Sequence, residues 1–132
     1  MGDSLTKLLL VEDDKQLGEM YAKKFNKNGY EVTLVKDGAT GLSKTHSENF
    51  DVVVLDIMLP GLSGIEALGM IRSERKTAKT PVIIYTNYGD QSNREKCLTY
   101  GADEFILKVD TTPESLCETI GRILTEKKIE KV

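Results

Sequence analysis

The sequence contains few cysteines and no long hydrophobic segment. Its two cysteines, Cys97 and Cys117, show no CxxC spacing and have no histidine partner, so we expect no disulfide framework. The first six residues are polar and do not resemble a signal sequence. The apolar runs Leu8–Val11 and Val52–Leu55 are far shorter than the roughly 20 residues that span a bilayer. These absences predict a protein of the reduced cytoplasm with no membrane insertion.

The sequence also lacks a strong charge imbalance. Its 18 basic and 21 acidic side chains give a formal net charge of −3, and no long basic stripe runs along the chain. Because contact with a phosphate backbone needs clustered positive charge, we expect no direct binding to nucleic acid. The glycine-rich motifs GxGxxG and GxxxxGKS, which bind phosphate groups through backbone amides, are absent as well.

The length of the chain indicates one domain. With 132 residues, of which 39% are hydrophobic, the chain can bury a core without disulfides. The sequence shows no second composition regime, internal repeat or low-complexity linker. We therefore expect a single domain over residues 1–132, with a core of about residues 7–125 and a charged helix end or tail over residues 126–132.

Five short apolar segments, rich in β-branched residues, predict buried strands. They are Lys7–Val11, Glu31–Val35, Asp51–Leu55, Pro81–Tyr85 and Glu104–Leu107. Helical patterns follow the strands over residues 17–25, 39–47, 64–74, 91–100 and 116–124. Strands that are apolar throughout need cover on both faces, and strand–helix alternation makes the sheet parallel with right-handed crossovers. The sequence therefore predicts a doubly wound α/β fold, a three-layer sandwich around a five-stranded parallel sheet.

Polar residues follow the carboxyl ends of four of these strands. In strand order they are Glu12-Asp13-Asp14, Asp56, Thr86-Asn87 and Lys108. Because the carboxyl ends of parallel strands open on the same edge of the sheet, we expect these residues to converge on one site. Carboxylate oxygens from two strands, completed by water and a main-chain carbonyl, suit a hard octahedral cation. We therefore expect Mg²⁺, for which Mn²⁺ would substitute.

Each of these residues also has a purely structural interpretation. An acid such as Asp13 or Asp14 at a strand–helix junction is often a helix N-cap, and Asp56 alone could belong to a turn before Pro60. Lys108 alone could be a solvated strand end. The combination favours the metal site, because adjacent unpaired carboxylates are costly without a cation.

Four motifs resemble those of the response-regulator receiver domain. They are VEDD after the first strand, LDIMLPGLSG around Asp56, PVIIYTNYGD around Thr86 and GADEFILK around Lys108. The resemblance extends from about Lys7 to Leu124, with each motif at a strand end and in the expected order. It implies a flavodoxin-like (βα)5 fold with strand order 2-1-3-4-5, and a phosphoacceptor signalling module rather than an enzyme.

The resemblance implies a role for each acidic residue. Asp56 would accept a phosphoryl group from a sensor histidine kinase or a histidine phosphotransfer protein. Glu12, Asp13 and Asp56 would bind Mg²⁺ together with the main-chain carbonyl of Met58. The chemistry of the residues agrees, because a carboxylate attacks a charged phosphoryl group only when cations neutralise the charge that gathers there.

The resemblance also implies a switch. Lys108 would pair with the Asp56 carboxylate and then with the phosphoryl oxygens, while Thr86 would donate a hydrogen bond to one of them. Inward movement of Thr86 would let Phe105 turn from exposed to buried and alter a face formed by the fourth helix, the fifth strand and the fifth helix. Since the chain ends with the fifth helix, we expect a stand-alone module that acts on an unknown output protein or through a phosphorylation-dependent homodimer.

The sequence departs from the family at several positions. Lys108 is followed by Val109 instead of the usual proline, and we expect a trans bond there because a cis bond before a residue other than proline costs about 2.5–4 kcal/mol. Asn87 is larger than the small residue typical of its position and crowds or contacts the phosphoryl group. Met58 and Tyr88 are bulky and flank the approach of hydrolytic water, so we expect slow loss of the phosphoryl group.

Three other functions compete with this interpretation. A haloacid-dehalogenase-type phosphohydrolase also uses an aspartyl nucleophile and Mg²⁺, but Met58 stands where that class carries its second acid. A flavodoxin-like electron carrier would need a glycine-rich phosphate loop after the first strand, where this chain is acidic. A receiver-like docking module that no longer uses phosphorylation stays open because of Val109 and Asn87.

Overall fold

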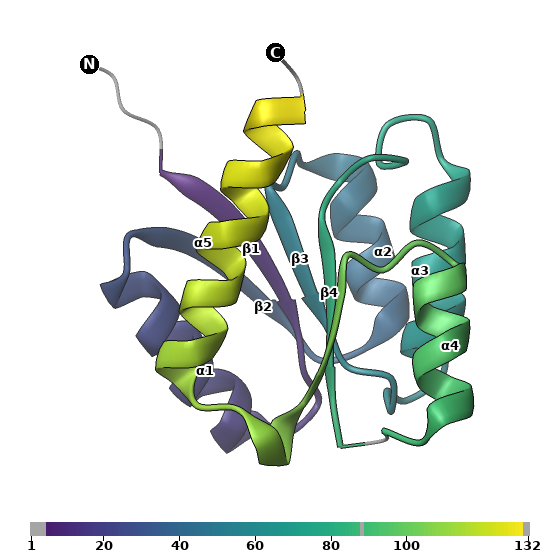
Figure 1. Ribbon diagram of the computed structural model, residues 1–132, viewed down its shortest axis with the longest axis horizontal. Coiled ribbons are helices and arrows are strands. Elements are labelled where there is room, and N and C mark those ends of the chain that lie inside the picture. Colours follow the sequence, from purple (N-terminus) through teal and green to yellow (C-terminus); the bar gives the residue numbers. More distant parts are fainter. Residues whose placement is uncertain (1–4, 88, 131–132) are drawn as a thin grey trace.

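Strands and helices alternate along the whole chain, as predicted (Figure 1). The computed structural model describes residues 5–87 and 89–130, with side chains through residue 127. The elements are β1 (Thr6–Val11), α1 (Lys15–Lys27), β2 (Tyr30–Val35), α2 (Gly38–Ser47), β3 (Val52–Leu55), α3 (Gly64–Ser73), β4 (Val82–Thr86), α4 (Gln91–Thr99), β5 (Glu104–Leu107), the 3-10 turn η1 (Lys108–Asp110) and α5 (Pro113–Glu130).

The five strands form one parallel sheet in the order β2-β1-β3-β4-β5. Figure 1 shows α1 and α5 on one face of this sheet and α2, α3 and α4 on the other. The doubly wound, flavodoxin-like architecture is therefore confirmed, and the carboxyl ends of the strands share one edge.

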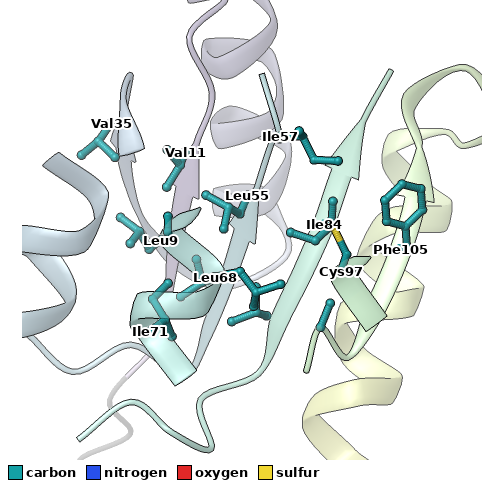
Figure 2. Close-up of a cluster of buried hydrophobic side chains, with 14 residues drawn as sticks. Leu9, Val11, Val35, Leu55, Ile57, Leu68, Ile71, Ile84, Cys97 and Phe105 are labelled. Carbon is teal, nitrogen blue, oxygen red and sulfur yellow. The ribbon is translucent and has the colours of Figure 1, made fainter. Parts of the chain in front are cut away.

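Two hydrophobic cores, one on each face, hold the layers together. Successive side chains of a strand point to opposite faces, so Leu9 of β1 packs on the α3 side while Leu8 packs on the α1 side. Figure 2 shows the core on the α3 side, where Leu68 and Cys97 come from two different helices. The other core contains the buried aromatic residues Tyr21, Phe25 and Tyr85 together with apolar residues of α5.

A few boundaries differ from those predicted. β3 begins at Val52 because the Asp51 carboxylate instead accepts a hydrogen bond from the Lys7 amide at 2.8 Å. β4 extends through Thr86, which pairs in register with Leu107. α5 continues to Glu130, so residues 126–130 are a helix end and not a tail. Among the described residues, no helix is long and apolar enough to cross a membrane.

Candidate functional site

The carboxyl ends of β1, β3 and β5 bring three charged side chains into direct contact. The Lys108 Nζ lies 2.6 Å from the Asp56 Oδ2 and 2.6 Å from the Glu12 Oε1. Asp56 is 6% exposed, Glu12 is 3% exposed and the Lys108 side chain is 10% exposed. The pairing of Lys108 with Asp56 agrees with the expected contact, whereas the equally short contact with Glu12 was not anticipated from the sequence.

Three carboxylates converge at this edge. One oxygen from each of Glu12, Asp13 and Asp56 can be chosen so that all three lie within 4.8 Å of one another. They line a pocket of about 400 Å³ together with Asp14, Leu17, Met58, Asn87 and Lys108. Lys108 offsets only part of this negative charge. The oxygen donor set fits Mg²⁺, which prefers carboxylates, carbonyls and water as ligands.

Burial acts in opposite directions on the pKa values of Glu12 and Lys108, yet both pKa values are raised. Burial raises the pKa of Glu12, and the nearby Asp56 charge adds to this, while Lys108 and the Asp14 amide act against it. Burial lowers the pKa of Lys108, but its contacts with Asp56 and Glu12 outweigh burial and leave the pKa raised. Lys108 is therefore an ammonium at neutral pH, ready to pair with an anion.

Asp14 is a helix N-cap, the structural role that the sequence also allows for an acid in this loop. Its carboxylate accepts a hydrogen bond from the Leu17 amide at 2.9 Å and caps the N-terminus of α1. Its own amide donates to the Glu12 Oε2 at 3.1 Å. Asp13, next to this cap, is exposed and lines the pocket.

The loop after β3 fixes Asp56 through close backbone packing. A Cβ at Gly64 would lie 1.9 Å from the Asp56 carbonyl oxygen, so only glycine lets the start of α3 approach this loop. The Gly64 amide donates to the Ile57 carbonyl at 2.9 Å, and the Met58 amide donates to the Asp56 Oδ1 at 3.3 Å. The Met58 side chain is exposed at the mouth of the pocket.

The loop after β4 supplies the remaining predicted site residues. Thr86 is fully buried at the end of the strand, and Asn87 follows it as an exposed residue that lines the pocket. Tyr88, which we expected to flank the approach of water, lies outside the described residues. A Cβ at Gly89 would lie 1.9 Å from the Leu107 side chain, so the loop runs close over the end of β5.

The peptide bond after Lys108 is trans, as expected, since the described residues contain no cis bond. Residues Lys108–Asp110 form the turn η1, and Val109 is exposed. The turn carries the Lys108 side chain to Asp56 without the proline that usually follows this lysine.

Phe105 is buried in the core on the α3 side (Figure 2). The Arg94 guanidinium of α4 lies 5.8 Å from the ring centroid, and its Nη1 donates to the Phe105 carbonyl at 3.5 Å. The ring is therefore buried and covered by α4, whereas the switch that the resemblance implies begins from an exposed ring.

Sequence reasoning missed one aromatic residue at the site. The Lys108 Nζ lies 5.5 Å from the ring centroid of Tyr85, and the Tyr85 hydroxyl donates a hydrogen bond to the Tyr21 hydroxyl. The only signal in the sequence was a polar aromatic residue inside the otherwise aliphatic segment PVIIYT.

Comparison with known proteins assigns the family. Residues 8–121 match the family described as response regulator receiver domain. The chain is 41% identical over 116 residues to the transcriptional activator protein PfeR of Pseudomonas aeruginosa. The aligned region covers 88% of this chain and 36% of PfeR. The chain therefore belongs to the response regulator receiver domain family, and it spans between about a third and a half of the length of the curated relatives that it matches.

Solved structures give the same result. A CheY-like receiver domain protein from Methanospirillum hungatei superimposes with a TM-score of 0.90 at 31% identity, covering 96% of this chain and 99% of that one. The receiver domain of the Pseudomonas aeruginosa sensor histidine kinase PA1611, determined with a magnesium ion in its active site cleft, superimposes with a TM-score of 0.84 at 28% identity, covering 92% and 99%.

Family membership defines the class of activity. A receiver domain is a regulatory phosphoacceptor rather than an enzyme, and its existence implies a cognate histidine kinase. The phosphohydrolase and electron-carrier alternatives are thereby excluded. The acidic pocket with Lys108 is the signalling site of this module.

Proposed function

We propose that Asp56 is the residue that accepts the phosphoryl group, in a reaction that uses Mg²⁺ bound by Glu12, Asp13, Asp56 and the main-chain carbonyl of Met58. The observation that carries this proposal is the contact of the Lys108 ammonium with Asp56, at 2.6 Å, inside an acidic pocket. The magnesium ion in the receiver of PA1611 supports the choice of metal, and Mn²⁺ would substitute for it.

Asp56 acts as the nucleophile. One carboxylate oxygen attacks the phosphorus of a phosphohistidine, an O–P bond forms as the N–P bond breaks, and the imidazole leaves with the electron pair. Bound Mg²⁺ would neutralise negative charge on the phosphoryl oxygens. Lys108 already lies at Asp56 and provides a second cation, while the Thr86 hydroxyl donates a hydrogen bond to one phosphoryl oxygen.

The aspartyl phosphate carries more negative charge and more acceptor oxygens than the free carboxylate, so it attracts Thr86 and Lys108. Movement of Thr86 would be transmitted to Phe105 and so to the face formed by α4, β5 and α5. This face would bind the output protein or a second copy of the chain. The phosphodonor would be a sensor histidine kinase or a histidine phosphotransfer protein, in the cytoplasm, and residues 1–132 would work as one domain.

Met58, Asn87 and Tyr88 would set the lifetime of the phosphoryl group. Met58 and Asn87 line the mouth of the pocket and supply neither an acid nor a base that could activate water. The phosphoryl half-life of the purified protein should therefore be minutes or longer, and a half-life of seconds would refute this role.

Intact-mass spectrometry tests the proposal. The protein is incubated with Mg²⁺ and either acetyl phosphate or a phosphohistidine-bearing kinase domain, with Asp56→Asn in parallel. We expect one added phosphoryl group on the wild type, dependent on Mg²⁺, and none on the variant. The absence of an adduct with both donors, while Mg²⁺ still binds, would instead favour a docking module that does not use phosphorylation.

A further inference from the structure

A buried pair of tyrosines lies directly behind the site, and the phosphotransfer described above makes no use of it. Tyr85 belongs to β4 and Tyr21 to α1, 64 residues apart, and the Tyr85 hydroxyl donates a hydrogen bond to the Tyr21 hydroxyl. Tyr85 is only 3% exposed, and Tyr21 is also buried. In the described part of the chain no buried side-chain nitrogen or oxygen lacks a hydrogen-bond partner. The two tyrosine hydroxyls satisfy each other on an otherwise apolar face of the sheet.

The Tyr85 ring also contacts the ammonium of the site. The Lys108 Nζ lies 5.5 Å from the ring centroid, within the roughly 6 Å at which a cation is attracted to an aromatic face. Tyr85 pairs in register with Ile106, two residues before Lys108, so β4 presents its ring on the side from which the lysine reaches Asp56. Lys108 therefore has three contacts: two carboxylates and one aromatic ring.

Helix α1 restricts the orientation of the Tyr85 ring. The rings of Tyr21 and Tyr85 meet edge to face, with centroids 5.1 Å apart and an interplanar angle of 68°. Tyr21 in turn packs against Phe25 on the same helix at 5.8 Å. Moving the Tyr85 ring would break the hydroxyl contact and this aromatic packing, so α1 holds the surface on which Lys108 lies.

We propose that Tyr85, held by Tyr21, is a positioning residue that keeps the Lys108 ammonium directed at Asp56 and so connects α1 to the phosphorylation site. A lysine has a long flexible side chain, and a fixed ring beneath its ammonium removes arrangements in which it points away from Asp56. The effect on phosphotransfer rests on the function proposed above, whereas the effect on Lys108 itself does not.

The rate of phosphorylation by acetyl phosphate with Mg²⁺ tests the proposal in two backgrounds. Tyr85→Leu should slow the wild-type reaction by about 2- to 30-fold, the range expected for loss of a cation–aromatic contact. In a Lys108→Ala background the same change should alter the rate by less than about twofold, because no ammonium remains to be positioned. A general structural defect at Tyr85 would slow both backgrounds equally, and that result would overturn the proposal.

A matched control removes a ring from the same core away from the lysine. Phe25→Leu should lower the stability of the fold but leave the phosphorylation rate within about twofold, since Phe25 contacts Tyr21 and not Lys108.

Tyr85→Phe and Tyr21→Phe each remove the same hydroxyl contact and are milder changes. Each should slow the reaction slightly, and the double variant should be no slower than either single variant. Wild-type rates in the folded Tyr85→Leu protein would contradict the proposal.

The ammonium resonance of Lys108 gives a second measurement that needs no phosphodonor. In ¹⁵N-lysine-labelled protein, the Lys108 Nζ signal should be displaced by the Tyr85 ring current and protected from hydrogen exchange, and Tyr85→Leu should remove both effects. An unchanged Lys108 signal in Tyr85→Leu would overturn the proposal. If the wild type accepts no phosphoryl group from any donor, the proposed function is wrong, and this measurement still decides whether Tyr85 positions Lys108.

Discussion

The two edges of the sheet organise their charges differently. At the edge where the strands begin, here called the amino edge, the side chain of Arg72 from α3 is 17% exposed. Its guanidinium donates hydrogen bonds to the Asp103 carboxylate at 3.0 Å and to three carbonyls, those of Gly101, Thr77 and Thr80. Asp103 also accepts from the Val82 amide. At the carboxyl edge, Lys108 faces two buried carboxylates, and the third, that of Asp13, is exposed.

The difference lies in what remains unneutralised. Each hydrogen bond that Arg72 donates at the amino edge goes to an acceptor of the protein. These bonds connect α3 with the segments that lead into β4 and β5. The carboxyl edge keeps an excess of negative charge that the protein does not offset, and its pocket is open to solvent. The first arrangement stabilises the fold, while the second is costly until a cation binds. The following predictions separate the two.

The largest expected effect is on stability at the amino edge. Arg72→Ala should lower the free energy of unfolding by about 3 kcal/mol, because three carbonyls lose this donor and Asp103 loses its guanidinium partner in a mostly buried position. Urea denaturation measures the loss. The phosphorylation rate per folded molecule should stay within about twofold of wild type, and a much slower reaction would show that the two edges are not independent.

Metal binding should respond only at the carboxyl edge. Asp13→Asn should weaken Mg²⁺ binding at least tenfold, about 1.4 kcal/mol, because one carboxylate of the site is lost. Isothermal titration calorimetry measures the affinity. Asp14→Asn is the matched control: asparagine can still cap α1, and we expect Mg²⁺ affinity within about threefold of wild type. Equal losses in both variants would argue against Asp13 as a specific ligand.

The tyrosine beside the site should make the fold sensitive to alkaline pH. Burial, followed by the contact with Tyr21, raises the pKa of Tyr85 in the folded protein. The unfolded chain releases this proton from about pH 10 upward while the folded state retains it, so the unfolded state gains stability as the pH rises. Relative to Tyr85→Phe, the wild type should lose up to about 1.4 kcal/mol per pH unit above pH 10. Urea denaturation at pH 8, 10 and 11 measures this, and parallel curves for the two proteins would contradict it.

The smallest effect is expected at the rim of the amino edge. The Lys127 Nζ lies 3.2 Å from the second oxygen of Asp103, but the lysine side chain is half-buried and partly solvated. Lys127→Ala should therefore cost less than about 1 kcal/mol of unfolding free energy, far less than Arg72→Ala. A cost equal to that of Arg72→Ala would mean that Asp103 depends on both cations equally.

Most of the fold could be predicted from hydrophobic pattern alone. The predicted strand Glu104–Leu107 coincides with β5, although only Phe105 of this outer strand is buried. The unbroken apolar signal of a strand covered by helices on both faces is found in β3, which is buried at every position. Errors occurred where hydrogen bonds decide a boundary. Asp51 was assigned to a strand although its side chain bonds the Lys7 amide, and Thr86 was left outside one although it pairs with Leu107.

The members of the site could be predicted, but not all of their contacts. Asp56 and Lys108 follow strand ends, and parallel strands bring their ends together whatever the loops do. The contact between Glu12 and Lys108 joins residues 96 positions apart. It depends on the direction in which each side chain points, and the spacing of apolar residues along the sequence does not predict that direction. The same holds for Tyr21 and Tyr85, where the helical and strand patterns identified core positions but not the hydroxyl contact.

The most direct test of the central claim is to locate the phosphoryl group. After incubation with Mg²⁺ and acetyl phosphate, borohydride reduction converts an aspartyl phosphate to homoserine, and peptide mass spectrometry identifies the position. The account predicts homoserine at position 56, dependent on Mg²⁺, in both the wild type and Arg72→Ala. Homoserine at position 13 or 14, or modification that does not require Mg²⁺, would contradict it.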